Sequence, residues 1–288
     1  MTRRPVDGPS LLCITRPELE TTNRLLAEAC DRLGVGFATV VAGQATSGDF
    51  STWRDGRLLY RAATDEGSLC LERLLVGPDV ACLHDPHFPC ADPAARLFRA
   101  GLPMPRRVFV PARDHERLEA QAAWLGGFPV VVKRPGAEGG RGVSLVGSID
   151  ALVREVLAAP PGVAIEAFVP HARSYRLFVA GGRVLATTAA TPGPGDFRTN
   201  APSSRSLGAA VAPHGAEHIA VQAAAALAVD VAGVDLMEST DGTLLLTEAN
   251  FPCYFADQQA ETGVDLAGAI VRCLARKLGA QSSPFASA

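Results

Sequence analysis

Lysine is nearly absent from this chain: only Lys133 and Lys277 occur among 288 residues, against 25 arginines. The seven cysteines form no CxxC pair and are odd in number, which argues against a disulfide framework and predicts reduced thiols. No apolar run reaches the roughly 18 residues that a membrane-spanning helix needs. The net charge of −3 and the scattered arginines give no general attraction to nucleic acid. We therefore expect neither a membrane nor a nucleic acid as a partner.

The overall composition is that of a folded globular protein. Hydrophobic residues make up 48% of the chain and charged residues 20%, which is typical of a protein with a substantial core. The length allows about two or three packed subdomains. Because the N-terminus leads into only a short apolar stretch, we expect no signal peptide and a cytoplasmic location.

The first part of the chain follows a strand–helix–strand pattern. A short apolar strand is predicted at 11–14, a helix at 18–33 that Gly34 closes, and a second strand at 37–41. This order implies a parallel α/β unit with a right-handed crossover. A Pro-rich segment at 84–89 marks its end. Later helices are expected near 93–100, 114–125, 215–228 and 263–278. We predict three units, spanning residues 1–89, 90–163 and 164–288.

Lys133 stands out because the chain otherwise selects arginine. It follows the apolar strand 128–132 and precedes the glycine-rich loop 136–142. A compact ammonium beside such a loop suits phosphate, because the charge can track moving oxygens while loop N–H groups approach closely. The alternative is a lysine that lies at a strand end by chance. Lys277, in the last turn of a predicted helix, is explained as a surface residue that favours the helix dipole.

Two carboxylates are predicted to face each other in a hairpin. Asp241 and Gly242 separate two apolar runs, which is a strong hairpin signal. With these two residues as the turn, Asp235 lies directly opposite Glu248, with Cβ atoms about 5 Å apart, and Asn250 points to the same face. Opposed carboxylates repel unless a cation lies between them, and oxygen ligands alone favour Mg²⁺ over zinc. The alternative is a pair of solvated surface carboxylates.

Several segments resemble, in order, the motifs of the ATP-grasp superfamily. The closest resemblance is to the branch that contains the ribosomal-protein glutamate ligases and the glutathione synthetase-like amide ligases. It covers roughly residues 90–278. The matching segments are 128–133, 136–143, 165–169, 175–179, 195–200, 233–235 and 248–250.

The resemblance implies an α/β protein with the ATP-grasp fold. An N-terminal parallel α/β domain would be followed by a small central lid domain and a C-terminal α+β domain, with ATP between the last two. The implied activity is an ATP- and Mg²⁺-dependent carboxylate–amine ligase, with Mn²⁺ as an alternative ion. It would act through an acyl phosphate, release ADP and phosphate, and use an amino acid or small peptide and an amine. The protein could act as a monomer or as a homo-oligomer.

The resemblance also assigns residues. Asp235, Glu248 and Asn250 would hold the metal. Arg176 and Arg198, supported by Asn200, would stabilise the transferring phosphoryl group. The nucleotide would contact the lysine strand (128–133), the glycine-rich lid (136–143), the hinge (165–169) and the strand that follows (175–179). The contacting residues would be Lys133, Gly139, Gly140, Arg141, Gly142, Glu166, Ala167, Phe168, Val169 and Ser174, which directly precedes the last of these strands.

The chain departs from the family pattern at three places. Ser174 stands where the family has an acidic residue for the ribose. No lysine precedes Lys133, so Arg96 or Arg99 would have to replace an earlier family lysine. The bulky segment 251–255 would border the substrate pocket, which predicts a carboxylate substrate different from that of the ribosomal-protein ligases. These departures leave open a nucleotide-binding regulatory or carrier-binding protein with impaired catalysis.

Two other signals have competing interpretations. Cys82, His84, His87 and Cys90 could ligate zinc, but their spacing matches no standard finger, and structural or pocket-lining roles are favoured. Cys253 could be imagined as a nucleophile, but no histidine follows it in the chain. An apolar thiol in the pocket wall is the favoured interpretation.

Overall fold

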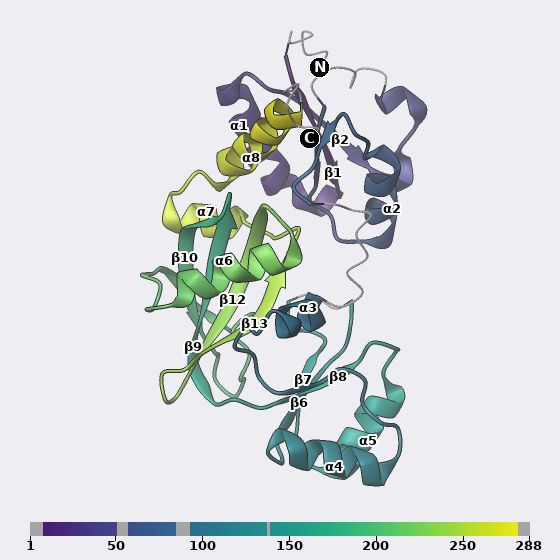
Figure 1. Ribbon diagram of the computed structural model, residues 1–288, viewed down its shortest axis with the longest axis vertical. Helices are drawn as coiled ribbons and strands as arrows, with labels where there is room; N and C mark the ends of the chain where they lie inside the picture. Colours follow the sequence, from purple (N-terminus) through teal and green to yellow (C-terminus); the bar gives the residue numbers. More distant parts are fainter. Residues whose placement is uncertain (1–7, 51–56, 85–92, 137–138, 282–288) are drawn as a thin grey trace.

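The computed structural model describes residues 8–50, 57–84, 93–136 and 139–281. Three β-sheets follow one another along the long axis of the molecule (Figure 1). The N-terminal sheet lies at one end, the C-terminal sheet in the middle and the central sheet at the other end. No helix among the described residues is long and apolar enough to cross a membrane.

The N-terminal sheet is parallel, as the strand–helix–strand pattern predicts. Its strand order is β2-β1-β3-β4. The strands are β1 (Ser10–Thr15), β2 (Gly36–Val41), β3 (Arg57–Arg61) and β4 (Val80–Ala81). Helix α1 (Glu20–Leu33) follows a 3-10 turn and ends at Gly34, whose φ of 67° is the left-handed conformation that glycine adopts at little cost. Helix α2 (Glu66–Leu75), which the sequence patterns did not predict, begins after Asp65, whose carboxylate accepts the Ser68 N–H.

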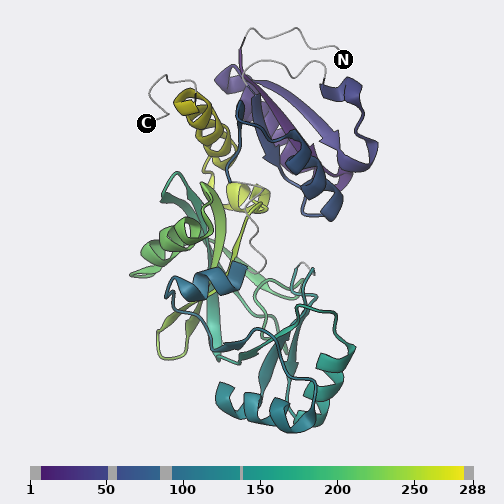
Figure 2. The ribbon, with the colours of Figure 1, turned by 45° about the vertical axis from the view of Figure 1, so that its right-hand side comes forward.

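The last helix of the chain packs against this first sheet. Helix α8 (Leu266–Gln281) lies beside α1, and the two enclose one hydrophobic core with the N-terminal strands (Figures 1 and 2). Leu11 and Tyr60 from the sheet and Ile270 from α8 belong to this core. The first and last parts of the chain therefore fold as one body, which the sequence-based division into three units does not anticipate.

The central sheet is antiparallel and has the order β5-β8-β6-β7. Its strands are β5 (Arg107–Val108), β6 (Val130–Lys133), β7 (Val143–Val146) and β8 (Ala164–Ala167). Helices α4 (His115–Leu125) and α5 (Ile149–Ala158) cover one face. The predicted boundary at residue 164 assigns β8 to the third unit, whereas β8 is hydrogen-bonded within the central sheet.

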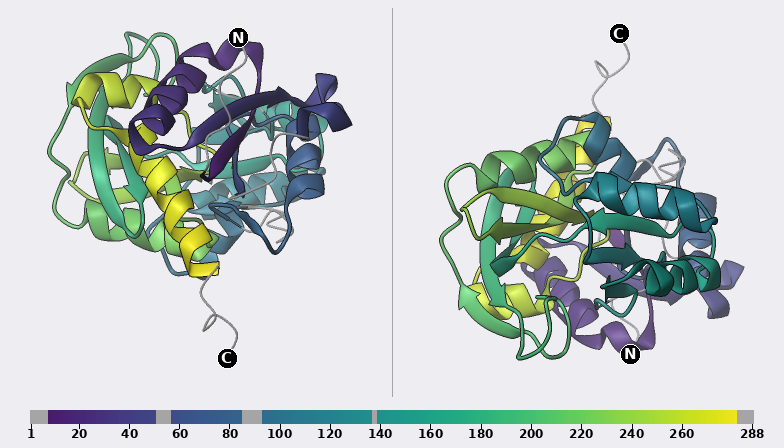
Figure 3. Two further views of the ribbon diagram at one scale, coloured as in Figure 1. Left: turned by 90° about the horizontal axis from the view of Figure 1, so that it is seen from above. Right: turned by 90° about the horizontal axis from the view of Figure 1, so that it is seen from below.

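The C-terminal sheet has the order β11-β10-β9-β12-β13, with every pair antiparallel. The strands are β9 (His171–Ala180), β10 (Arg183–Thr191), β11 (Arg205–Ala209), β12 (Val231–Ser239) and β13 (Leu244–Asn250). Helix α6 (Ala216–Leu227) and helix α3 (Pro93–Arg99) pack on one face, while α7 (Ala256–Thr262) contacts β10 and β11 (Figure 3).

The β12–β13 hairpin has a different turn from the predicted one but the predicted pairing at its far end. The Ser239 N–H donates to Thr243 O at 3.0 Å, so the turn contains three residues, not two. A bulge at Thr247 then adds one residue to β13 and restores the predicted register. Asp235 consequently lies opposite Glu248, as expected.

The bulky segment after β13 joins the domains. The Phe251 ring lies 4.4 Å from the His84 ring and 6.2 Å from the Tyr60 ring, between centroids. Phe255 is fully buried against Phe178, with ring centroids 6.3 Å apart. The aromatic bulk of this segment is thus used mainly to pack the C-terminal sheet against the N-terminal domain.

Candidate functional site

Three predicted site residues form one row across neighbouring strands. Arg176 on β9 is the register partner of Asp235 on β12, and Asp235 is the register partner of Glu248 on β13. By the period of two, Arg176 shares its sheet face with Phe178, which packs in the core that α8 covers. The row therefore lies on the face turned towards the N-terminal domain.

The charges in this row are not equivalent. The Arg176 guanidinium donates to both oxygens of Asp235, at 2.8 and 2.7 Å, and the Asp235 charge is the main reason that the pKa of Arg176 is raised. Burial and the nearby Asp235 charge raise the pKa of Glu248 above its ordinary value. A hydrogen bond from Asn250 and the charges of Lys133 and Arg176 oppose that shift. Glu248 is thus the carboxylate that would gain most from an added cation.

The oxygen donors of this row fit a hard divalent cation. Asp235, Glu248 and Asn250 supply carboxylate and amide oxygens only, the ligand type that Mg²⁺ prefers. Although Arg176 binds both Asp235 oxygens, each oxygen keeps a second lone pair. No cluster of three His, Cys, Asp or Glu side chains suited to a metal occurs among the described residues, so the amide would be the third protein ligand.

Lys133 enters the same site from the central sheet. Its ammonium lies 2.8 Å from Glu166 Oε2, and its charge acts on Glu248. Arg107 Nη1 donates to the other Glu166 oxygen at 2.9 Å. Glu166, only 3% exposed, is therefore a shared counter-ion, a role for its side chain that the hinge motif did not predict. No sequence motif marked Arg107, because β5 is two residues long and carries no recognisable pattern.

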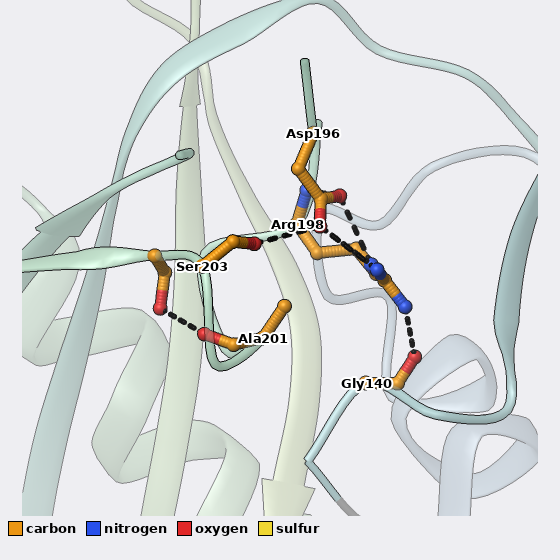
Figure 4. Close-up of polar contacts among 6 residues, drawn as sticks. Gly140, Asp196, Arg198, Ala201 and Ser203 are labelled. Carbon is orange, nitrogen blue, oxygen red and sulfur yellow. Dashed lines mark hydrogen bonds and ion pairs between the residues drawn. The ribbon is translucent and has the colours of Figure 1, made fainter. Parts of the chain in front are cut away.

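Arg198 connects the glycine-rich loop to the loop 195–200. Its Nη1 donates to Gly140 O at 2.8 Å, while its Nε and Nη2 donate to Asp196 (Figure 4). These hydrogen bonds hold the pKa of Asp196 below its usual range. The Ser203 hydroxyl donates a further side-chain hydrogen bond to Asp196, at 2.9 Å. All three guanidinium nitrogens of Arg198 are thus engaged in this arrangement.

Gly140 is required where the two loops meet. Its φ of 71° is left-handed, and a Cβ at this position would lie 2.8 Å from Asn200 Oδ1. Gly139 has a similar φ of 61°, but a Cβ there would meet nothing closer than 4.0 Å. The predicted loop residues 137 and 138 lie outside the described part of the chain, and Arg141 is exposed.

Three of the predicted hinge residues line a cavity of about 500 Å³. Ala167, Phe168 and Val169 form part of its wall, with Leu245 from β13. The Phe168 ring also contacts Phe197, with centroids 5.9 Å apart, which links the hinge to the loop 195–200. A second cavity of about 520 Å³ lies between β7 and that loop and includes Arg198.

The residues that depart from the family pattern lie at three different places in the structure. Ser174 lies on β9 opposite Met237, on the same face as Arg176. Arg96 donates to Leu227 O at the end of α6, at 3.4 Å, and Arg99 is exposed. The cationic side chain that accompanies Lys133 is Arg107 rather than Arg96 or Arg99, because Arg107 and Lys133 both pair with the Glu166 carboxylate.

The part of the chain that the structure describes does not favour a zinc site at 82–90 or a nucleophilic role for Cys253. Cys82 is buried, and His84 Nε2 lies 3.4 Å from Glu72 Oε2, whereas His87 and Cys90 lie outside the described residues. Burial raises the pKa of Cys253 to about 12, which leaves it protonated and disfavours a nucleophilic role. Its position against Gly233 matches a thiol that fills space.

Comparison with known families gives one match that covers more than half of the chain. The RimK-like ATP-grasp domain matches residues 94–274. A "Probable alpha-L-glutamate ligase" of Parasynechococcus marenigrum is 33% identical over 192 residues, which cover 65% of this chain and 41% of that protein. A similarly named protein of Pseudoalteromonas atlantica is 28% identical over 188 residues, covering 63% and 61%. The chain thus spans less than two thirds of the length of these relatives.

Solved structures share the overall fold of this chain. The ATP-grasp ligase PsnB, solved with a precursor variant, Mg and ADP, has a TM-score of 0.68 at 17% identity, covering 96% of this chain and 100% of PsnB. A RimK domain protein from Sphaerobacter thermophilus has a TM-score of 0.63 at 22% identity, covering 92% and 99%. At these identities the likenesses concern the fold, and they confirm the fold that the motifs predicted.

Proposed function

This chain belongs to the RimK-like ATP-grasp family, and we propose that it is an ATP- and Mg²⁺-dependent carboxylate–amine ligase. The observation that carries the proposal is the row of Arg176, Asp235 and Glu248, which lies within electrostatic reach of Lys133. Cations and oxygen ligands from two different sheets converge here, as transfer of a phosphoryl group requires.

The metal would be held by Asp235, Glu248 and Asn250. When bound, a divalent ion supplies positive charge to phosphate oxygens and relieves the repulsion between the two carboxylates. The pair between Arg176 and Asp235 orients the Asp235 carboxylate for this role.

The proposed reaction has two steps. A substrate carboxylate oxygen attacks the γ-phosphorus of ATP, the bond to the β,γ-bridging oxygen breaks, and ADP and an acyl phosphate form. An amine nitrogen then attacks the acyl carbon, phosphate leaves, and the nitrogen loses a proton. Lys133 would bind phosphate oxygens, and Arg176 and Arg198 would stabilise negative charge that develops on the transferring group. For Arg198 this requires an exchange of partners, because its nitrogens bind Asp196 and Gly140.

The substrates are proposed by class. The curated relatives are named as glutamate ligases, and PsnB was solved with a precursor peptide. We propose an amino acid or peptide carboxylate as the activated substrate and an amino acid as the amine. A screen of both classes for substrate-stimulated phosphate release would identify the pair.

The nucleotide product tests the mechanism. We expect ADP and phosphate in amounts equal to the ligated product, and a hydroxamate when hydroxylamine replaces the amine. AMP as the stoichiometric product would refute the acyl-phosphate route. Tight Mg·ATP binding without turnover on any substrate would instead favour the regulatory or carrier-binding alternative.

A further inference from the structure

A buried carboxylate in the central sheet is bound by two cations. Glu166 Oε2 lies 2.8 Å from the Lys133 ammonium, and Glu166 Oε1 lies 2.9 Å from Arg107 Nη1. Each cation therefore occupies a different oxygen. The side chains of Arg107 and Glu166 are 11% and 4% exposed, whereas that of Lys133 is 26% exposed. The lysine is the member of the group that reaches towards solvent.

The sheet register explains why the three side chains meet. Glu166 on β8 is the register partner of both Arg107 on β5 and Val131 on β6. Lys133 lies two residues beyond Val131 and so points to the same face, where a long side chain reaches a diagonal neighbour. The meeting of these charges is built into three adjacent strands.

The net charge of the group depends on Arg107. A Lys133–Glu166 pair alone would be neutral, and the buried carboxylate would oppose the binding of phosphate. With Arg107 the group carries a net charge of about +1. Only one of the three ammonium protons is needed for Glu166, so the others remain for a ligand. The Phe109 ring, 5.2 Å from the Arg107 guanidinium carbon, helps to fix the arginine.

We propose that Arg107 is a positioning residue for the nucleotide site: by sharing Glu166, it keeps the Lys133 ammonium oriented and still positive towards phosphate. The inference rests on the proposed function, because it assumes that Lys133 meets a nucleotide phosphate. Arg107 itself acts through Glu166 and need not touch the nucleotide.

A charge-rescue experiment distinguishes this role from a structural one. The Kd for Mg·ADP is measured by calorimetry for the wild type, Arg107→Gln, Arg107→Lys and the double variant Arg107→Gln/Glu166→Gln. Arg117→Gln removes the same charge from an exposed site on α4 and serves as the control. Thermal unfolding of each variant shows whether it is folded at the temperature of the titration.

We expect Arg107→Gln to weaken Mg·ADP binding roughly tenfold, which is about 1.4 kcal/mol. Arg107→Lys should stay close to the wild type. The double variant should regain most of the affinity, because removal of the Glu166 charge restores the net charge near +1. A merely structural role predicts the opposite, with the double variant no tighter than the single one.

The outcomes separate the two proposals. If the wild type binds no Mg·ADP, the proposed function fails. If the wild type binds but Arg107→Gln binds equally well, or the double variant shows no rescue, the positioning role is overturned while the proposed function stands. If Arg107→Gln fails to fold, Mg·ADP binding is compared between the folded Arg107→Lys and double variants. Binding by the double variant that is much weaker than binding by Arg107→Lys contradicts the positioning role.

Discussion

The Arg176 guanidinium binds both carboxylate oxygens of Asp235 across the β9–β12 pairing, at 2.8 and 2.7 Å. On the other side of Asp235, Glu248 has no such partner arginine in its register position and its pKa is raised. The two carboxylates of the proposed metal site therefore differ in their effect on the folded state.

Substitution of the two carboxylates should separate activity from stability. Asp235→Asn and Glu248→Gln should each lower Mg²⁺-dependent phosphate release roughly a hundredfold, because each removes charge that the transfer requires. Without Mg²⁺, Asp235→Asn should destabilise the protein by about 1.5–3 kcal/mol, because Arg176 loses a charged acceptor. Glu248→Gln should not destabilise it, because repulsion from Asp235 is relieved. Urea unfolding and phosphate assays measure both effects, and unchanged phosphate release in both variants would contradict the metal assignment.

Lysine at position 133 should not be replaceable by arginine. Lys133→Arg should raise the KM for ATP or lower kcat by roughly tenfold or more, because a planar fork does not fit the place of a compact ammonium held by Glu166. The control is Lys277→Arg, which changes the only other lysine of the chain. Lys277 pairs with Asp230, far from Lys133 in sequence, so this substitution should leave the kinetics unchanged. Full activity of Lys133→Arg would show that the lysine has no special role.

Gly139 and Gly140 of the glycine-rich loop should respond differently to substitution by alanine. Both have a left-handed φ, so both substitutions strain the backbone by about 1 kcal/mol. Only Gly140→Ala places a Cβ 2.8 Å from Asn200 Oδ1, so it should also disturb the contact with the loop 195–200 and lower turnover more than Gly139→Ala. Steady-state kinetics compares the pair. Addition of Asn200→Ala to Gly140→Ala should recover part of the loss, and equal effects of the two glycine substitutions would refute the contact.

Acid should weaken the N-terminal domain through Glu72. Burial raises the pKa of this carboxyl, but a hydrogen bond from His84 and the charge of Arg61, whose Nε lies 2.7 Å away, outweigh burial and lower it. A lowered folded-state pKa adds stability above the unfolded value of about 4.3, and that stability is lost as the pH falls through the folded value. Glu72→Gln should therefore cost roughly 3–5 kcal/mol at pH 7, with a smaller cost below about pH 4.

Urea unfolding at several pH values measures this difference. Glu119→Gln, which changes an exposed carboxylate on α4, is the matched control and should show little effect. A cost of Glu72→Gln that stays constant down to acid pH would show that the charge of Glu72 is not what stabilises the domain.

The sequence by itself determined features whose causes are local. Apolar periodicity and a terminal glycine set α1, and the Asp241-Gly242 turn predicted between two apolar runs placed Asp235 opposite Glu248. That second success depended on compensation. The turn is one residue longer than predicted, and the bulge at Thr247 restored the register, so the pairing was correct although the turn was not.

Tertiary structure alone decided the partners of the charges. Arg107, Lys133 and Glu166 are far apart in the chain, and only the strand order β5-β8-β6 brings them together. Helix α8 could be predicted from its periodicity, but its packing on the first sheet could not, because an apolar face does not specify which surface covers it. Local patterns fix what each segment can form, whereas burial of surfaces distant in sequence fixes which charges meet, and in this protein the site depends on both.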